Sequence, residues 1–158
     1  MTLLSYYGIF RVGEVISLSD REVIRGLIER AIEAREFAYT PYSNFKVGAA
    51  LLTKSGKIYT GCNIESVSYS PTTCAERVAV LKAVSEGERS FSMLAVIGSP
   101  ADGETKTDGY AAPCGVCRQL IYEFGKDTII IIAKNADEYY ENSISELLPL
   151  GFGPENLI

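Results

Sequence analysis

The chain has 158 residues, of which 47% are hydrophobic and 22% are charged, and its formal net charge at pH 7 is −5. A chain of about 150 residues buries roughly two thirds of its unfolded surface, which predicts one domain with a true core. The acidic balance and the absence of clustered Lys and Arg argue against nucleic acid as a partner. No uncharged run reaches the length of about 18 residues that would indicate a membrane span.

The N-terminal segment Met1–Phe10 is apolar, but it lacks the basic start and the cleavage site of a signal peptide. We interpret residues 1–18 as an N-terminal extension and residues 19–158 as a single catalytic domain. Four cysteines in a chain without a secretion signal indicate metal ligands or reduced thiols rather than disulfides. They also predict a cytoplasmic location.

The first predicted element is a helix over Asp20–Phe37. Ser19-x-x-Glu22 has the form of a capping box at its start, and Thr40-Pro41 ends the pattern. The apolar residues that recur at helical spacing, and that we expect to be buried, are Ile24, Leu27, Ile28, Ala31 and Ala34.

The later elements follow from periodicity and turn residues. They are strands over Phe45–Thr53 and Lys57–Cys62, a helix over Cys74–Ser85, a strand over Phe91–Ile97, a helix over Cys114–Phe124, a strand over Thr128–Ala133 and a short helix over Ser143–Leu148. We expect Val78, Leu81 and Val84 to face inward, and Gly98–Ala112 to form a loop. The alternation of strands and helices after the first hairpin predicts a three-layer α/β/α fold with a mixed sheet.

Two short motifs carry the chemistry, namely Cys74-Ala75-Glu76 and Pro113-Cys114-Gly115-Val116-Cys117. Each motif is predicted to open a helix, whose free amides and partial positive charge favour a thiolate over a thiol. The chain contains no histidine, so the ligands of a metal would be sulfur. Three protein ligands and one open position for water are typical of catalytic zinc. Glu76 would then transfer protons beside the metal without binding it.

Other interpretations of the cysteines remain open. Cys114 and Cys117 alone also fit a dithiol redox pair without metal, and Cys62 would allow a four-cysteine structural zinc site. A polynucleotide deaminase would share the zinc chemistry, but it needs a basic channel, which the net charge of −5 disfavours. The two motifs together, with Pro113 before the second, match the three-cysteine signature of zinc-dependent nucleobase deaminases.

Several stretches in one order resemble the small, homotetrameric class of cytidine deaminases. They are Pro41–Ala50, Gly61–Glu65, Cys74–Arg77, Pro113–Gln119, and Glu146–Pro149 with Phe152–Glu155. The resemblance implies a mixed five-stranded sheet, one Zn2+ per subunit and a homotetramer with active sites at subunit contacts. It also implies hydrolytic deamination of cytidine and 2′-deoxycytidine in pyrimidine salvage, with a small nucleoside as the substrate and no nucleic acid or membrane partner. A blasticidin-type aminoacyl-nucleoside deaminase is the alternative.

The resemblance also implies roles for single residues. Cys74, Cys114 and Cys117 would bind zinc, Glu76 would be catalytic, and Arg77 would hydrogen-bond a ligand thiolate. The expected substrate contacts are Phe45 on the pyrimidine, Asn63 and Glu65 at the ribose 3′-hydroxyl, Ala75, and, in a neighbouring subunit's site, Tyr69 and Phe152. Core packing remains an alternative for Phe45, and an exposed surface position remains one for Arg77.

Overall fold

The computed structural model of the chain describes residues 18–102 and 109–157. Its elements in chain order are α1 (Leu18–Arg35), β1 (Phe45–Thr53), β2 (Ile58–Cys62), α2 (Ala75–Ser85), β3 (Phe91–Pro100), α3 (Gly115–Phe124), β4 (Ile129–Ala133), β5 (Tyr139–Ser143), α4 (Ile144–Leu147) and the 3₁₀ helix η2 (Pro154–Leu157). The predicted extension over residues 1–18 falls outside the described residues except for its last residue, so the division into extension and domain stays a prediction.

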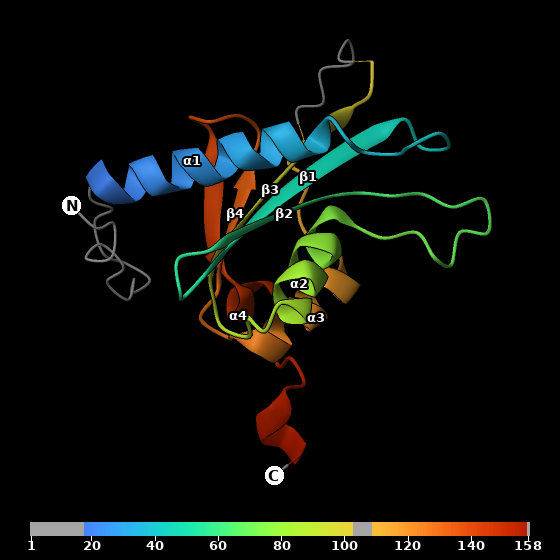
Figure 1. Cartoon of the computed structure of the whole chain (residues 1–158). Helices are drawn as coiled ribbons and strands as arrows, with labels where there is room; N and C mark the ends of the chain where they lie inside the picture. The colour runs from blue at the N-terminus through green and yellow to red at the C-terminus, as the bar shows by residue number, and fades with distance from the viewer. Residues whose placement is uncertain (1–17, 103–108, 158) are drawn as a thin grey trace.

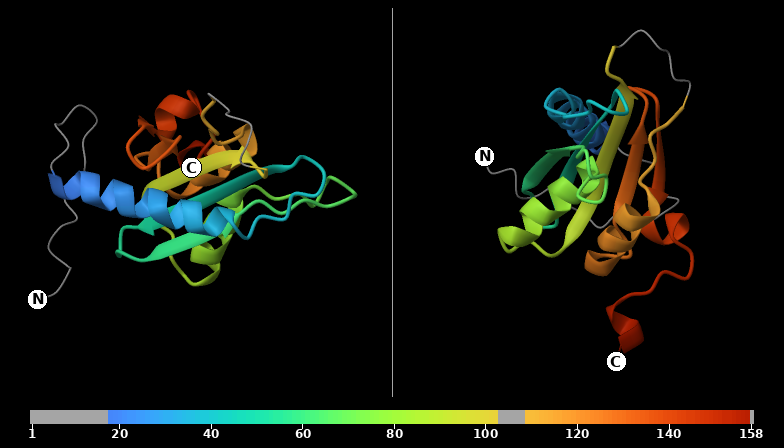
Figure 2. Two further views of the ribbon diagram at one scale, coloured as in Figure 1. Left: turned by 90° about the horizontal axis from the view of Figure 1, so that it is seen from above. Right: turned by 90° about the vertical axis from the view of Figure 1, so that its right-hand side faces the viewer.

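A five-stranded sheet in the order β2-β1-β3-β4-β5 lies at the centre of the molecule (Figure 1). β3 and β4 are parallel, and the other neighbouring strands pair antiparallel, so the sheet is mixed. The parallel pair is joined through α3, as a parallel pair requires a crossover connection. α1 covers one face of the sheet, and α2, α3 and α4 lie on the other (Figure 2). The predicted three-layer α/β/α fold is confirmed.

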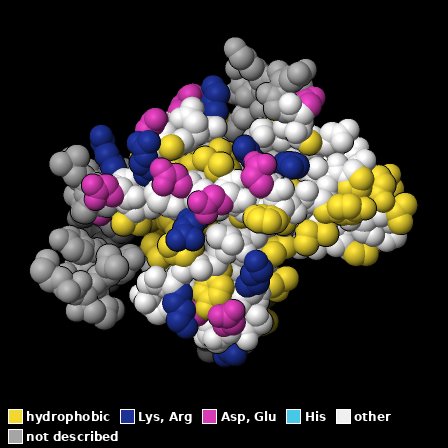
Figure 3. Space-filling view, turned by 45° about the horizontal axis from the view of Figure 1, so that its top comes forward, with side chains coloured by type: hydrophobic (Ala, Val, Ile, Leu, Met, Phe, Trp, Pro, Cys, Tyr) yellow, Lys and Arg dark blue, Asp and Glu magenta, His cyan; other side chains and the backbone are white. Residues whose placement is uncertain are grey.

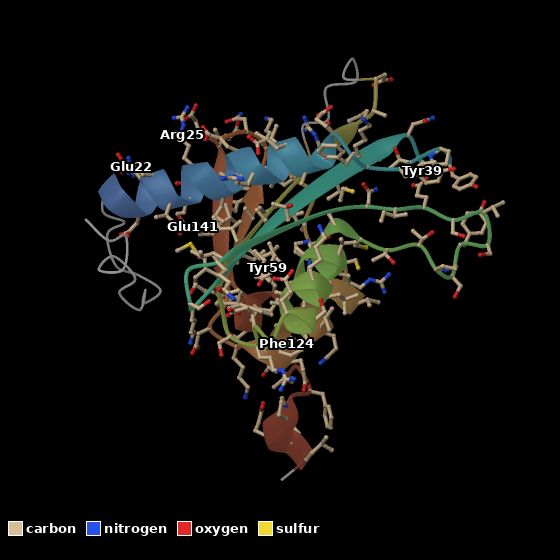
Figure 4. The ribbon with its side chains drawn as sticks, viewed as in Figure 1. Glu22, Arg25, Tyr39, Tyr59, Phe124 and Glu141 are labelled. Carbon is tan, nitrogen blue, oxygen red and sulfur yellow. The ribbon has the colours of Figure 1, made fainter. Side chains whose placement is uncertain are left out.

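Alternate residues of the strands face two separate apolar cores. The α1 side contains the five apolar residues predicted from the helical spacing, each at most 9% exposed. The strand residues packed in that core are Ala50, Leu52, Met93, Ala95, Ile97, Ile131 and Ala133. The core under α2 and α3 contains Leu51, Tyr59, Phe91, Leu94, Val96, Ile130 and Ile132. Tyr59 and Phe124, labelled in Figure 4, lie on this second side.

Two glycines let helices approach the sheet closely on opposite faces. A Cβ atom at Gly48 would lie 1.9 Å from the carbonyl oxygen of Ala31 in α1. A Cβ atom at Gly61 would lie 2.4 Å from the carbonyl oxygen of Ala75 in α2. Only glycine permits such close backbone contact. Gly61 therefore determines how closely the start of α2, where the first cysteine motif lies, packs on β2.

Two boundary predictions are wrong. α1 begins at Leu18, so Ser19 lies inside the helix and is not its cap. β3 continues to Pro100, because its last three residues pair with Phe45–Val47 of β1, and the predicted loop therefore begins later than Gly98. The ends of the other predicted helices and strands differ from the observed ends by two residues or fewer.

The prediction that Leu81 faces inward is also wrong, because its side chain is 53% exposed. The buried residues of α2 are Ala75, Glu76, Ala79, Val80 and Ala83. They are mostly small because α2 packs so close to β2, and Val78 and Val84 are only partly buried. No helix in the described part of the chain is long and apolar enough to cross a membrane.

Candidate metal centre and active site

Three cysteine sulfurs meet between the starts of α2 and α3. Cys74 directly precedes α2, Cys114 directly precedes α3, and Cys117 is buried in the first turn of α3. The Sγ–Sγ distance is 3.8 Å for Cys74–Cys114 and 3.6 Å for Cys114–Cys117, and all three sulfurs lie within 4.8 Å of one another. Tetrahedral zinc with Zn–S bonds of about 2.3 Å needs sulfurs about 3.8 Å apart. This three-cysteine cluster therefore has the dimensions of a zinc site.

Hydrogen bonds among the sulfurs shift the pKa values of Cys74 and Cys117 in opposite directions. A hydrogen bond from Cys117 lowers the pKa of Cys74 to about 6, against the opposing effect of burial, and Cys114 and the charge of Arg77 add to the lowering. The pKa of Cys117 is raised, because its thiol donates to Cys74 and is buried near Glu76. The side chains of Cys74 and Cys114 do not cap their helices, and the partial positive charge at the two helix starts favours thiolates there. Metal binding would replace the shared thiol protons.

Glu76 lies in the first turn of α2 and is 4% exposed. Burial raises the pKa of its carboxyl group, and the negative charge of Cys74 raises it further. Hydrogen bonds from its own backbone amide and from Cys117 oppose this shift. A buried carboxyl group with a raised pKa, placed two residues after a cysteine of the cluster, is suited to taking up and releasing protons there.

Arg77 is half-buried, which does not fit an ordinary surface arginine. Its Nη2 donates to the carbonyl oxygen of Thr72 at 2.6 Å, and its positive charge lowers the pKa of Cys74. Its Nε is buried and has no hydrogen-bond partner among the described residues. An unpaired buried donor costs about 1–3 kcal/mol, so this Nε would gain from an acceptor such as a ligand thiolate.

Cys62, the fourth cysteine, lies on the opposite face of the sheet. It is paired with Gly48 in the β1–β2 ladder, so both residues face α1. Burial raises the pKa of the Cys62 thiol. The group of potential metal ligands contains the other three cysteines and not this one. The arrangement leaves the four-cysteine structural site without its fourth sulfur.

Phe45 lies at the start of β1, close to Gly98 and Ala111. It is half-buried, and a Cβ atom at Gly98 would lie 2.7 Å from its Cε1 and 2.7 Å from the Cβ of Ala111. The ring therefore covers the end of β3, next to the segment that leads into Pro113 and Cys114. Gly98 leaves space for this ring. The placement is compatible with stacking on a planar base, which stays a prediction.

Asn63 braces the start of β1. Its Oδ1 accepts from the backbone N–H of Val47 at 2.8 Å, and its Nδ2 donates to the carbonyl oxygen of Phe45 at 2.9 Å. No pattern in the sequence predicted that Asn63 would hold the backbone of β1 in this way. A side-chain amide can form about four hydrogen bonds, so the remaining donor and acceptor capacity is available to a ligand. The predicted ribose contact of Asn63 stays a prediction.

Glu65 holds the turn that precedes β1. Its Oε2 accepts from the backbone N–H groups of Tyr42 at 2.9 Å and Ser43 at 3.2 Å. The pKa of Glu65 is lowered, first by a hydrogen bond from the Ser43 hydroxyl and then by these amides, so the group is held ionised. An ionised carboxylate is a strong acceptor for a hydroxyl donor. Its contact with a ribose likewise stays a prediction.

Tyr69 and Phe152 are exposed in the single chain, at 75% and 58% respectively. Tyr69 lies in the β2–α2 loop, which projects beyond the sheet beside the α1–β1 loop (Figure 1). Figure 3 shows hydrophobic side chains gathered at this end of the molecule, and Figure 4 labels Tyr39 there. The backbone of Tyr69 has a φ of 60°, an unfavourable value for a bulky residue. Whether these two side chains contact another subunit stays a prediction.

Sequence reasoning gave no role to Arg118, although it directly follows Cys117. Its Nε donates to the carbonyl oxygen of Pro113 at 2.7 Å, and Pro113 directly precedes Cys114. The available signal was the position of an arginine immediately after a Cys-x-x-Cys motif. The close packing of Gly61 on α2 was missed as well, because only the folded structure reveals it.

Three sulfurs at the spacing of zinc ligands, next to a buried carboxyl group, define the site of a zinc-dependent deaminase. Residues 21–133 match the family described as the cytidine and deoxycytidylate deaminase zinc-binding region. The cytidine deaminase of Sporosarcina psychrophila is 47% identical over 135 residues, which cover 85% of this chain and 94% of that protein. The chain belongs to the cytidine and deoxycytidylate deaminase zinc-binding family.

Solved structures agree with this assignment. The crystal structure of cytidine deaminase from Burkholderia pseudomallei has a TM-score of 0.72 and 45% identity, covering 80% of this chain and 97% of its own. The Blasticidin-S deaminase of Bacillus cereus is a more distant relative, at 33% identity over 127 residues, or 80% of this chain and 89% of that protein. Zinc is the metal of this family, and the three-cysteine cluster fits one such ion.

Proposed function

We propose that the protein hydrolyses cytidine and 2′-deoxycytidine to uridine and 2′-deoxyuridine, with release of ammonia. The observation that carries this proposal is the position of Glu76, which is 4% exposed in the first turn of α2, two residues after Cys74, whose sulfur lies within 4.8 Å of those of Cys114 and Cys117. Relatives named cytidine deaminase, at 47% and 45% identity, support the choice of substrate.

In this proposal Cys74, Cys114 and Cys117 hold zinc as thiolates. When bound, zinc supplies Lewis-acid activation of water at neutral pH. Three thiolates outweigh the charge of one dication, which makes that activation harder. The partial positive charge at the starts of α2 and α3 and the positive charge of Arg77 stabilise negative charge on the sulfurs and offset this effect.

Glu76 transfers both protons of the reaction. It takes a proton from the attacking water and delivers it to N3 of the pyrimidine while the water oxygen bonds to C4. It then passes the remaining proton of that oxygen to the exocyclic amine. The C4–N4 bond breaks, ammonia leaves, and a carbonyl group remains at C4. The raised pKa of Glu76 suits this exchange, because the group must be able both to accept and to donate near neutral pH.

The remaining predicted residues bind the nucleoside. Phe45 packs on the pyrimidine, Ala75 contacts it from the start of α2, and Asn63 and Glu65 bind the ribose 3′-hydroxyl through their remaining hydrogen-bonding capacity. Hydrogen bonds to the backbone already orient both polar side chains, which lowers the entropic cost of holding a ribose.

We also propose a homotetramer in which Tyr69 and Phe152 reach a neighbouring subunit's site. This proposal is supported by the apolar surface of the α1–β1 and β2–α2 loops. Its exposed residues include Tyr39, Tyr42, Ile64, Val67 and Tyr69. Monomers seldom leave a contiguous surface of this kind uncovered. The enzyme would work in the cytoplasm, in pyrimidine salvage.

The ultraviolet change on conversion of cytidine to uridine tests the proposed activity. Zinc-loaded protein should turn over cytidine, lose activity with a chelator and regain it when zinc is added. Glu76→Ala should keep its zinc and lose turnover by several orders of magnitude. Full turnover by metal-free protein, or normal turnover by Glu76→Ala, would contradict the proposal. Blasticidin S as a parallel substrate tests the alternative activity.

A further inference from the structure

Arg118 makes three hydrogen bonds, and two of them go to the peptide groups that flank Cys114. Its backbone N–H donates to the carbonyl oxygen of Cys114 at 2.9 Å. Its side-chain Nε donates to the carbonyl oxygen of Pro113 at 2.7 Å, and its Nη1 donates to the carbonyl oxygen of Leu147 at 2.8 Å. The first of these bonds is ordinary for a helix. The two side-chain bonds are specific to an arginine, whose planar guanidinium donates in two directions.

The carbonyl groups of Pro113 and Cys114 belong to the peptide units on either side of the Cys114 Cα atom. The Pro113 carbonyl fixes the plane of the preceding peptide, and the Cys114 carbonyl fixes the plane of the following one. Together they determine the backbone angles of Cys114, which are −69° for φ and 166° for ψ. Cys114 is exposed, and its side chain makes no cap hydrogen bond, so packing contributes little to holding it.

The guanidinium is itself anchored to a rigid element. Leu147 ends α4, a helix that Ser143 and Glu146 close with a reciprocal capping box. Ile144 of the same helix is fully buried in the core under α3. A hydrogen bond to the carbonyl of Leu147 therefore ties the guanidinium, and through it Pro113, to the core of the domain.

We propose that Arg118 is a positioning residue that fixes the backbone of Cys114 and so keeps the three-cysteine cluster in its zinc-binding shape. The inference rests on the proposed function, because it takes Cys114 to be a zinc ligand. Arg118 forms no ion pair with any carboxylate in the described part of the chain, so its contribution is geometric. Arg77 differs in this respect, because its charge acts on Cys74.

Gln119 provides a matched control on the same helix. Its Nε2 donates to the carbonyl oxygen of Phe152 at 2.7 Å, which is a single bond from α3 to the C-terminal segment. Gln119→Ala therefore removes one side-chain bond to a backbone carbonyl, next to Arg118, without affecting the carbonyl groups around Cys114. Arg118→Lys keeps the positive charge but cannot span the carbonyls of Pro113 and Leu147 together.

The test measures the rate of zinc transfer from the loaded protein to a chromophoric chelator, together with the thermal unfolding midpoint of each variant. We expect zinc release about 10–100-fold faster from Arg118→Ala, an intermediate rate from Arg118→Lys, and a rate within about two-fold of the parent from Gln119→Ala. If Arg118→Ala does not fold, the zinc-release rate of Arg118→Lys is compared with that of Gln119→Ala instead. The inference requires faster release from Arg118→Lys.

Release from the Arg118 variants at the parent's rate would overturn the inference, and so would release from Gln119→Ala as fast as from Arg118→Ala. A lowered unfolding midpoint with unchanged zinc release would likewise show that Arg118 serves stability alone. A parent protein that binds no zinc would refute the proposed function itself. The two failures are therefore distinguishable.

Discussion

Replacement of Gly61 by alanine should damage the active site by pushing the start of α2 away from β2. The added Cβ atom would lie 2.4 Å from the carbonyl oxygen of Ala75, 2.7 Å from the backbone nitrogen of Ala79 and 2.8 Å from the Cβ of Val78. Two of these atoms belong to the helix backbone, so rotation of a side chain cannot relieve the contact. An ordinary contact begins at 3.4 Å, so α2 must move by about 1 Å, and overpacking of this kind costs about 1–3 kcal/mol of stability.

The displacement would be centred on Ala75, which lies between Cys74 and Glu76. A shift of about 1 Å is enough to spoil the sulfur spacing and the reach of the carboxyl group, and such misplacement can lower turnover by about 10²-fold. We therefore expect Gly61→Ala to lose turnover and zinc affinity in addition to stability. The assays are urea unfolding, bound zinc per folded chain and the rate of cytidine conversion.

Gly48→Ala is the control for this experiment. Its Cβ atom would lie 1.9 Å from the carbonyl oxygen of Ala31, so the loss of stability should be at least as large. That contact displaces α1, on the face of the sheet that carries no cluster residue. Folded Gly48→Ala should therefore keep its zinc. Normal turnover by Gly61→Ala, or equal losses of zinc by both variants, would refute the reasoning.

Three further predictions concern single side chains. Burial raises the pKa of Glu76, so its ionised form destabilises the metal-free protein above that pKa, and the penalty disappears below the ordinary value of 4.5. Glu76→Gln should therefore raise the unfolding midpoint of metal-free protein at neutral pH and lose this advantage at about pH 4, whereas an equal shift at both values contradicts the argument. Glu65→Ala should weaken the use of cytidine far more than any action on free cytosine, as judged by kcat/KM, and equal losses would remove the ribose role. Cys62→Ser should keep both zinc and activity, since Cys62 faces α1, and loss of the metal in that variant would point to a fourth sulfur ligand.

Local patterns in the sequence predicted much of the fold. The five apolar residues of α1 repeat with the period of a helix, and all of them are buried. The hairpin of β1 and β2 and the buried strands β3 and β4 follow from runs of β-branched and apolar residues. β5 carries no such signal, because Tyr139–Ser143 is mainly polar and forms the edge of the sheet. Only the family resemblance pointed to a fifth strand.

The features that escaped prediction depend on contacts between distant parts of the chain. Leu81 is exposed because Gly61 brings small residues of α2 against β2, and helical spacing alone does not contain that information. The chemistry of Cys74 and Cys114 requires them to converge, so their proximity was predictable despite their separation of 40 positions in the sequence. The backbone contacts of Asn63 and Arg118 have no such chemical requirement, and only the structure reveals them.

The central claim is that three sulfurs hold zinc and leave one position for water. X-ray absorption at the zinc edge, measured on the loaded protein, tests it most directly. The account predicts three sulfur neighbours at about 2.3 Å and one lighter oxygen neighbour. Four sulfur neighbours would contradict it, because no coordination position would remain at which water could be activated.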